Sequence, residues 1–136
     1  MKEIEECARS LKSIGVKKDD IVTVCSPNIP QAVVLFYAIN MIGAVSNMIH
    51  PLSAEKEIEN YLCLSKSNYV FCIDISLDKL LNVIKNTSVE LVVVLSAADK
   101  MSTITKYAYK LTQGRKIKVD YNNEYLLSWS SFIDFG

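Results

Sequence analysis

Three short, almost wholly apolar segments constrain the fold of this chain most strongly. They cover residues 21–25, 69–73 and 90–95, and a fourth, more polar segment covers 44–49. A strand with one face in water alternates polar and apolar residues, whereas a strand buried on both faces reads as a continuous apolar run. We therefore expect four strands in a sheet that is covered on both sides.

The segments between these strands have helical periodicity. Apolar residues recur at the spacing of an α-helix over 3–14, 53–67 and 77–85, and residues 29–42 are apolar almost all round. A helix without a polar face is buried on several sides. Gly15 and Gly43 are expected to end the helices over 3–14 and 29–42. Asn28 and Ser53 are expected to cap the starts of the helices over 29–42 and 53–67 by accepting backbone hydrogen bonds.

Alternating strands and helices of this kind are typical of an α/β fold. We predict a doubly wound, mostly parallel sheet with helices on both faces. One α/β domain is expected over 1–136, with 1–95 as its core. The pattern beyond residue 95 is weaker: a helix over 101–112, a short strand over 117–119, and a tail anchored by three aromatic residues, Trp129, Phe132 and Phe135.

The balance of charge argues against several kinds of partner. Fifteen basic and fifteen acidic residues give a formal net charge of zero, so no electrostatic attraction to nucleic acid is expected. The lysines beside Tyr107, Tyr109, Tyr121, Tyr125 and Trp129 are interpreted as the rim of a core rather than as a stacking surface for bases.

No membrane association is expected either. The first ten residues are too polar for a signal peptide, and the apolar stretch over 32–45 is too short to span a bilayer. We therefore expect a cytoplasmic protein. Its four cysteines form no CxxC pair and are expected to be reduced and packed as small apolar residues, not to bind zinc. They are Cys7, Cys25, Cys63 and Cys72.

Parallel sheets bind ligands at the carboxyl ends of their strands. The candidate loops are therefore 26–29, 50–53, 73–76 and 96–101. The four glycines, at positions 15, 43, 114 and 136, never share a loop, so the glycine-rich loops that hold phosphate are absent.

Few side chains in the sequence are candidates for chemistry. His50 could position a ligand, but a loop histidine whose ring bonds nearby backbone is the stronger interpretation. Asp74 could hold Mg²⁺, although one acid is too few, and a solvated loop acid or helix cap is favoured. The adjacent acids Glu5–Glu6 and Asp19–Asp20 are interpreted as solvated charge. No catalytic, cofactor-binding or metal-binding residue is assigned.

A series of small and turn-forming residues carries a family resemblance. The series contains Ala8, Leu11, Gly15-Val16, Asp20-Ile21-Val22, Ser26-Pro27-Asn28, Ala38, Gly43-Ala44-Val45, Pro51-Leu52, Glu57-Ile58, Leu62 and Ser65. In order and spacing it resembles the early part of the adenylate-forming superfamily, which includes acyl-CoA synthetases, luciferases and peptide-synthetase adenylation domains. Two positions depart from the family pattern: Asp19 stands where a glycine is usual, and His50 where a neutral residue is usual.

The resemblance implies the N-terminal part of an ATP-dependent acyl-CoA synthetase. Such an enzyme uses Mg²⁺ and ATP to convert a carboxylic acid to an acyl-adenylate, releasing pyrophosphate, and then transfers the acyl group to a thiol, commonly coenzyme A. The family's Ser/Thr/Gly-rich phosphate loop and its later motifs are not in this sequence. No cofactor is therefore assigned to this chain, and the chain alone is expected to be inactive. Its expected partner is the remainder of the synthetase or a second copy in a homodimer.

Two other functions remain open from the residues alone. The chain could be a non-catalytic interaction domain that uses an apolar helix face to bind a partner. It could also be an unrelated Rossmann-like domain that binds a ligand, because strand–helix alternation is shared by many functions.

Overall fold

A computed structural model describes residues 2–95 and 126–134 of the chain. Five strands form one sheet in the order β2-β1-β3-β4-β5, and every neighbouring pair is parallel. The strands are β1 (Ile21–Cys25), β2 (Val45–Ile49), β3 (Tyr69–Ile73), β4 (Leu91–Leu95) and β5 (Leu126–Ser128). The carboxyl ends of all five strands therefore meet at one edge of the sheet.

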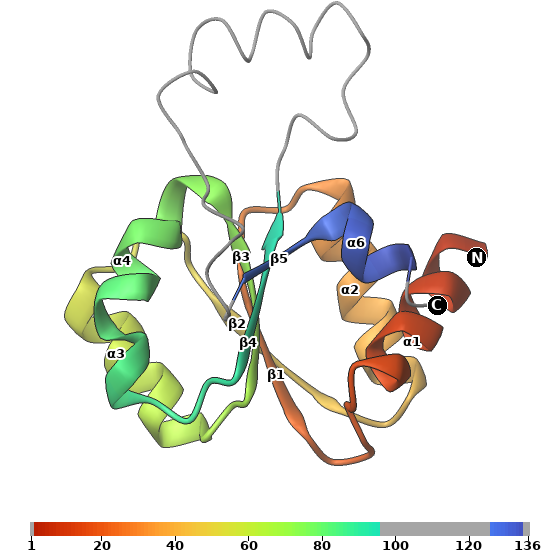
Figure 1. The fold of residues 1–136 in the computed structure, drawn as a ribbon, viewed down its shortest axis with the longest axis horizontal. Helices are drawn as coiled ribbons and strands as arrows, with labels where there is room; N and C mark the ends of the chain where they lie inside the picture. Colours follow the sequence, from red (N-terminus) through yellow and green to blue (C-terminus); the bar gives the residue numbers. More distant parts are fainter. Residues whose placement is uncertain (1, 96–125, 135–136) are drawn as a thin grey trace, which may run out of the picture.

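Helices cover both faces of this sheet (Figure 1). One layer contains α1 (Lys2–Ser13), α2 (Pro30–Met41) and α6 (Trp129–Asp134). The opposite layer contains α3 (Glu55–Ser65) and α4 (Leu77–Val83), with α4 flanked by the 3₁₀ turns η1 (Asp74–Ser76) and η2 (Ile84–Asn86). The predicted α/β fold with a parallel sheet and helices on both faces is confirmed.

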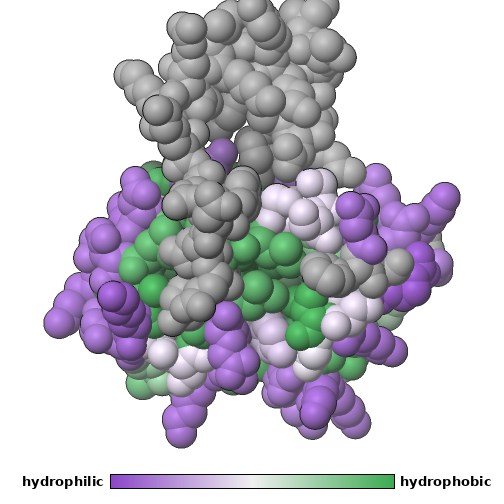
Figure 2. Space-filling model, viewed as in Figure 1, coloured by the Kyte–Doolittle hydropathy of each residue, from purple (hydrophilic) through white to green (hydrophobic). Residues whose placement is uncertain are grey.

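Each helix layer forms its own hydrophobic core against the sheet. On the α1/α2/α6 side, Phe71 packs edge-on against Phe132, with ring centroids 5.0 Å apart, and Trp129 lies 5.3 Å from Phe132. On the α3/α4 side the core is aliphatic, with Leu62 and Leu80 fully buried. Figure 2 shows hydrophobic residues gathered between the two layers and hydrophilic residues on their outer sides. Burial on both faces explains why β1, β3 and β4 are almost wholly apolar.

The tail is more regular than its sequence pattern indicates. Leu126–Ser128 adds a fifth strand beside β4, and α6 follows it directly. Trp129 and Phe132 are buried, as predicted, and the buried Ser10 hydroxyl donates to the Ile133 carbonyl oxygen, which ties α1 to α6. The predicted elements over 101–112 and 117–119, the tyrosines between 107 and 125, and Phe135 lie outside the described residues. The single domain over 1–136 stays a prediction.

The two glycine caps are confirmed, but the two side-chain caps are wrong. Gly15 and Gly43 have φ angles of 108° and 81°, and the amides of Val16 and Ala44 reach back to Leu11 and Ile39, as in Schellman motifs. The residues preceding α2 and α3 are Ile29 and Ala54, and neither helix has a side-chain cap. Asn28 and Ser53 each lie one residue too early to cap, and Pro30 at the start of α2 has no amide that needs one.

The expectation that α2 is buried on several sides is also wrong. Its inner face is buried at Ala32, Leu35, Ala38 and Ile39, but four apolar side chains on the opposite face are 39–55% exposed. No part of the chain that the structure describes covers this second face. We call it the exposed α2 face; it consists of Val33, Phe36, Tyr37 and Met41.

Asp19 occupies a backbone conformation that favours glycine. Its φ angle is 72°, and its amide donates to the Gly43 carbonyl oxygen at 2.9 Å, which joins the β1 turn to the end of α2. An L-residue with this φ angle is strained, whereas glycine adopts it freely. We expect Asp19→Gly to raise the free energy of unfolding by about 0.5–1 kcal/mol, measured by urea denaturation. Lys17→Gly, at an exposed position with negative φ, should lower it; equal effects would contradict this explanation.

Candidate functional site

A groove of about 600 Å³ opens at the carboxyl edge of the sheet. Its walls come from the loops that follow β1 and β2 and from the first turn after β3. These are three of the four loops that the sequence predicts; the fourth, 96–101, lies outside the described residues. The lining residues are Ser26, Pro27, Asn28, Met48, Ile49, His50, Pro51, Leu52 and Ile75.

Side-chain hydrogen bonds hold the groove loops to the helix layer behind them. The buried Ser76 hydroxyl of η1 donates to the Pro51 carbonyl oxygen at 2.6 Å, and Lys79 Nζ of α4 donates to the Ser53 carbonyl oxygen at 3.3 Å. Ser76 and Pro51 are 25 positions apart in the sequence. Both hydrogen bonds therefore join segments that are distant along the chain. The loop after β2 is thereby fixed relative to the loop after β3.

His50 makes the backbone contact that the sequence analysis favours. Its Nδ1 accepts a hydrogen bond from the Leu52 amide at 3.1 Å, while the residue remains exposed. In the neutral ring, Nε2 then carries the hydrogen and can donate a hydrogen bond to a ligand in the groove. Among the described residues that line the groove, none is an acid or a cysteine that could serve His50 as the partner of a general base.

The candidate acids do not form a catalytic group. Asp74 is half-buried as the first residue of η1, so it is neither a solvated loop acid nor the cap of that turn, which is Ile73. Asp19 and Glu5 are exposed, and Asp20 accepts a hydrogen bond from the Lys17 amide at 2.8 Å, as expected for a solvated turn. Within residues 2–95 and 126–134, no three His, Cys, Asp or Glu side chains lie close enough to hold a metal ion.

The cysteines are free, but only three are packed as predicted. Cys7, Cys25 and Cys72 are buried, whereas Cys63 is exposed on α3, where its thiol donates to the Asn86 carbonyl oxygen at 3.4 Å. The expectation that all four cysteines are packed as small apolar residues is therefore wrong for Cys63. Burial raises the pKa of the Cys7 thiol to about 12, because its thiolate would lose hydration.

Cys7 should make stability fall at alkaline pH. The unfolded thiol releases its proton near pH 9 and the folded one near pH 12, so the unfolded state gains stability within this window. Between these two pH values, Cys7 should change the free energy of unfolding by about −1.4 kcal/mol per pH unit. Urea denaturation of the wild type and of Cys7→Ala from pH 8 to 11 isolates the contribution of Cys7, because all other groups titrate in both proteins. Parallel curves would contradict the assignment.

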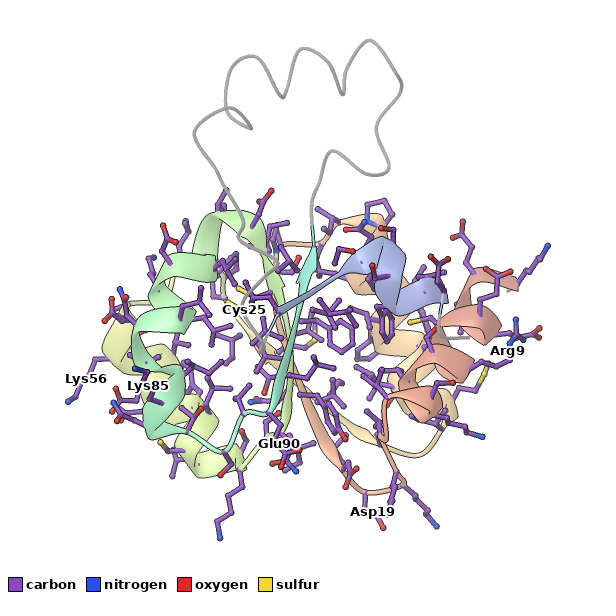
Figure 3. The ribbon with its side chains drawn as sticks, viewed as in Figure 1. Arg9, Asp19, Cys25, Lys56, Lys85 and Glu90 are labelled. Atoms are coloured by element: carbon purple, nitrogen blue, oxygen red, sulfur yellow. The ribbon has the colours of Figure 1, made fainter. Side chains whose placement is uncertain are left out.

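Two buried cysteines, Cys25 and Cys72, lie just below the groove. Cys25 ends β1 and faces Cys72 of β3 as its register partner. Cys25 also pairs with Ile49 of β2 and precedes Ser26 in the chain, and both of these neighbours line the groove. Figure 3 shows Cys25 beside the sheet, while the labelled Arg9, Lys56 and Lys85 point outward from the helices. This pairing depends on strand register, which the sequence alone does not reveal.

The groove offers shape and apolar surface rather than reactive groups. Met48, Leu52 and Ile75 are 47–72% exposed and present apolar side chains around it, with Ser26, Asn28 and His50 as its polar residues. Such a surface can bind an apolar or mixed ligand, or another part of a protein, and the described residues that line it include no acid–base pair. Among the described helices, none has the length and apolarity needed to cross a bilayer.

The parallel sheet and its two helix layers define a doubly wound α/β fold, and the groove lies at the carboxyl edge, where such sheets commonly bind ligands. A model of the AMP-binding enzyme family matches residues 1–129, and the chain belongs to this family. The predicted relation to the adenylate-forming enzymes is thereby confirmed.

The relatives are acyl-CoA ligases of much greater length. The chain is 27% identical over 115 residues to a long-chain-fatty-acid–CoA ligase of Bacillus subtilis, covering 85% of this chain and 20% of that protein. It is 45% identical over 49 residues to an acetyl-coenzyme A synthetase of Penicillium chrysogenum, covering 36% and 7%. The chain thus spans about a fifth of the first of these relatives.

Solved structures share the fold. Coronafacic acid ligase from Pectobacterium brasiliense superposes with a TM-score of 0.72 at 22% identity, over 97% of this chain and 23% of that one. A red-emitting luciferase from Phrixothrix hirtus also gives a TM-score of 0.72 at 22% identity, over 98% and 27%. At this identity, the likeness establishes the architecture alone.

Proposed function

We propose that the protein carrying this chain is an ATP-dependent acyl-CoA synthetase. It uses Mg²⁺ and ATP to convert a carboxylic acid to an acyl-adenylate and pyrophosphate, and a thiol, commonly coenzyme A, then accepts the acyl group. The observation that carries the proposal is the family match over residues 1–129. The two sequence relatives described above, a long-chain-fatty-acid–CoA ligase and an acetyl-coenzyme A synthetase, support the same reaction class.

Within that enzyme we assign the chain a structural role. Its sequence contains no glycine-rich phosphate loop, and the described residues that line its groove include no acid–base pair. The chain therefore supplies one α/β layer that supports the ATP-binding part, and alone it does not catalyse adenylation. The free cysteines are consistent with a reducing compartment such as the cytoplasm.

The exposed α2 face is the proposed contact with the rest of the synthetase. Its four side chains form one continuous apolar stripe, and Phe36 and Tyr37 pack edge-on with centroids 5.5 Å apart. Apolar surfaces of this kind mark sites of association. In the isolated chain, a second copy can cover the same stripe.

The test uses the native protein. An antibody against this chain should recover, from the source cells, a polypeptide several times heavier than 15.3 kDa that catalyses exchange of pyrophosphate into ATP when a carboxylic acid is supplied. A recovered polypeptide near 15.3 kDa without acid-dependent exchange would overturn the proposal and favour a separate interaction domain.

A further inference from the structure

Cys25 and Cys72 occupy directly paired positions on two neighbouring strands. They are register partners in the parallel pair β1–β3, so both side chains project from the same face of the sheet, toward α4. Neighbouring strands lie about 4.8 Å apart. A disulfide requires Cα atoms roughly 4.4–6.8 Å apart. We therefore expect the Cα atoms of Cys25 and Cys72 to lie within the range that a disulfide can span.

The surroundings give the two thiols different roles. The neighbouring Cys72 side chain lowers the pKa of the Cys25 thiol, and Lys79 and Ser76 add to this effect. The Cys25 side chain in turn raises the pKa of Cys72, which is fully buried and donates its thiol hydrogen to the Ile73 carbonyl oxygen at 3.3 Å. Cys25 is thus the sulfur that carries negative charge more readily, and Cys72 remains protonated beside it.

Cys25 is also the member of the pair nearer to the groove. It is 2% exposed, and its chain neighbour Ser26 and its ladder partner Ile49 both line the groove. A molecule as small as a peroxide needs only a brief local opening of these loops to reach it. Cys72 lies one strand further from the groove, between β1 and β4, and neither of its register partners, Cys25 and Val94, is among the groove-lining residues.

We propose that Cys25 and Cys72 form a reversible disulfide when the protein meets hydrogen peroxide. The Cys25 thiolate attacks one peroxide oxygen, the O–O bond breaks, and water leaves after protonation, which converts Cys25 to a sulfenic acid. The Cys72 thiol then displaces the sulfenic oxygen as a second water, and the S–S bond forms. Two thiols lose two electrons in all, and the peroxide is reduced to two waters.

The bridge would tie β1 to β3 beneath the groove. An excess of a dithiol reductant reduces a protein disulfide through a mixed-disulfide intermediate. We therefore expect dithiothreitol to restore both thiols. This modification is independent of adenylation, so it can be tested whether or not the proposed function is correct.

The experiment compares folded and urea-unfolded chain treated with hydrogen peroxide. In the folded chain we expect an intact mass lower by two hydrogen atoms, and peptide mapping that joins Cys25 to Cys72. In the unfolded chain, loop closure favours the pair closest in sequence, Cys63 and Cys72. Opposite pairings in the two states would show that the fold, not chain proximity, selects the bridge.

Matched variants complete the test. Cys63→Ser should form the bridge as the wild type does, whereas Cys72→Ala should lose it and accumulate oxygen atoms on Cys25 instead. A folded wild type that gains only oxygen atoms, stays fully reduced or joins Cys63 to another cysteine would overturn the proposal. Circular dichroism of each variant before treatment shows that it is folded.

Discussion

Replacing Phe132 with alanine should destabilise the chain by about 3–5 kcal/mol, as large-to-small changes of a buried aromatic residue do. Phe132 is fully buried, and its ring contacts Phe71 of the central strand β3 and Trp129. The change would leave a cavity between α6 and the sheet. Phe132 lies in α6, which follows the short strand β5 directly. The loss of stability therefore shows whether residues 126–134 are part of the core.

Urea denaturation followed by circular dichroism measures the change. Ser130→Ala, on the exposed side of the same helix, should stay within about 0.5 kcal/mol of the wild type. A Phe132→Ala free energy of unfolding within about 0.5 kcal/mol of the wild type, the range of an ordinary surface change, would contradict the packing of α6.

Introducing charge on the exposed α2 face should weaken self-association of the isolated chain more than about tenfold, which corresponds to 1.4 kcal/mol. Tyr37 and Met41 lie one helical turn apart and are 55% and 52% exposed. If a second copy covers them, Tyr37→Lys/Met41→Lys places two desolvated charges in the contact. Sedimentation equilibrium gives the dissociation constants.

A control double variant adds the same charge elsewhere. Ser13→Lys/Asn60→Lys changes two exposed polar residues outside the exposed α2 face and should leave association unchanged. A wild-type chain that stays monomeric at every concentration, or equal weakening in both double variants, would show that this face does not mediate association.

The main elements could be predicted from local sequence because each has a strong signal. Continuous apolar runs mark β1, β3 and β4, and Gly15 and Gly43 mark the two helix ends with positive φ. The fifth strand, Leu126–Ser128, is only three residues long, too short for any periodicity. It forms because β4 offers it hydrogen-bonding partners, which is a long-range effect.

The site could be predicted only in outline. Strand–helix alternation locates the loops after 25, 49 and 73 at one edge, and the groove is there. The pairing of Cys25 with Cys72 depends on strand order and register, which a single sequence does not contain. The exposure of one α2 face was missed because its apolar residues are the same kinds that fill a core.

The central claim is that this chain is one layer of an adenylate-forming enzyme and does not itself perform the chemistry. The most direct measurement is pyrophosphate exchange into ATP by the purified chain, with Mg²⁺ and a panel of carboxylic acids, beside a complete acyl-CoA ligase as positive control. We expect the chain to give no exchange above the buffer blank. Exchange that requires an acid and increases in proportion to the concentration of the chain would contradict the claim.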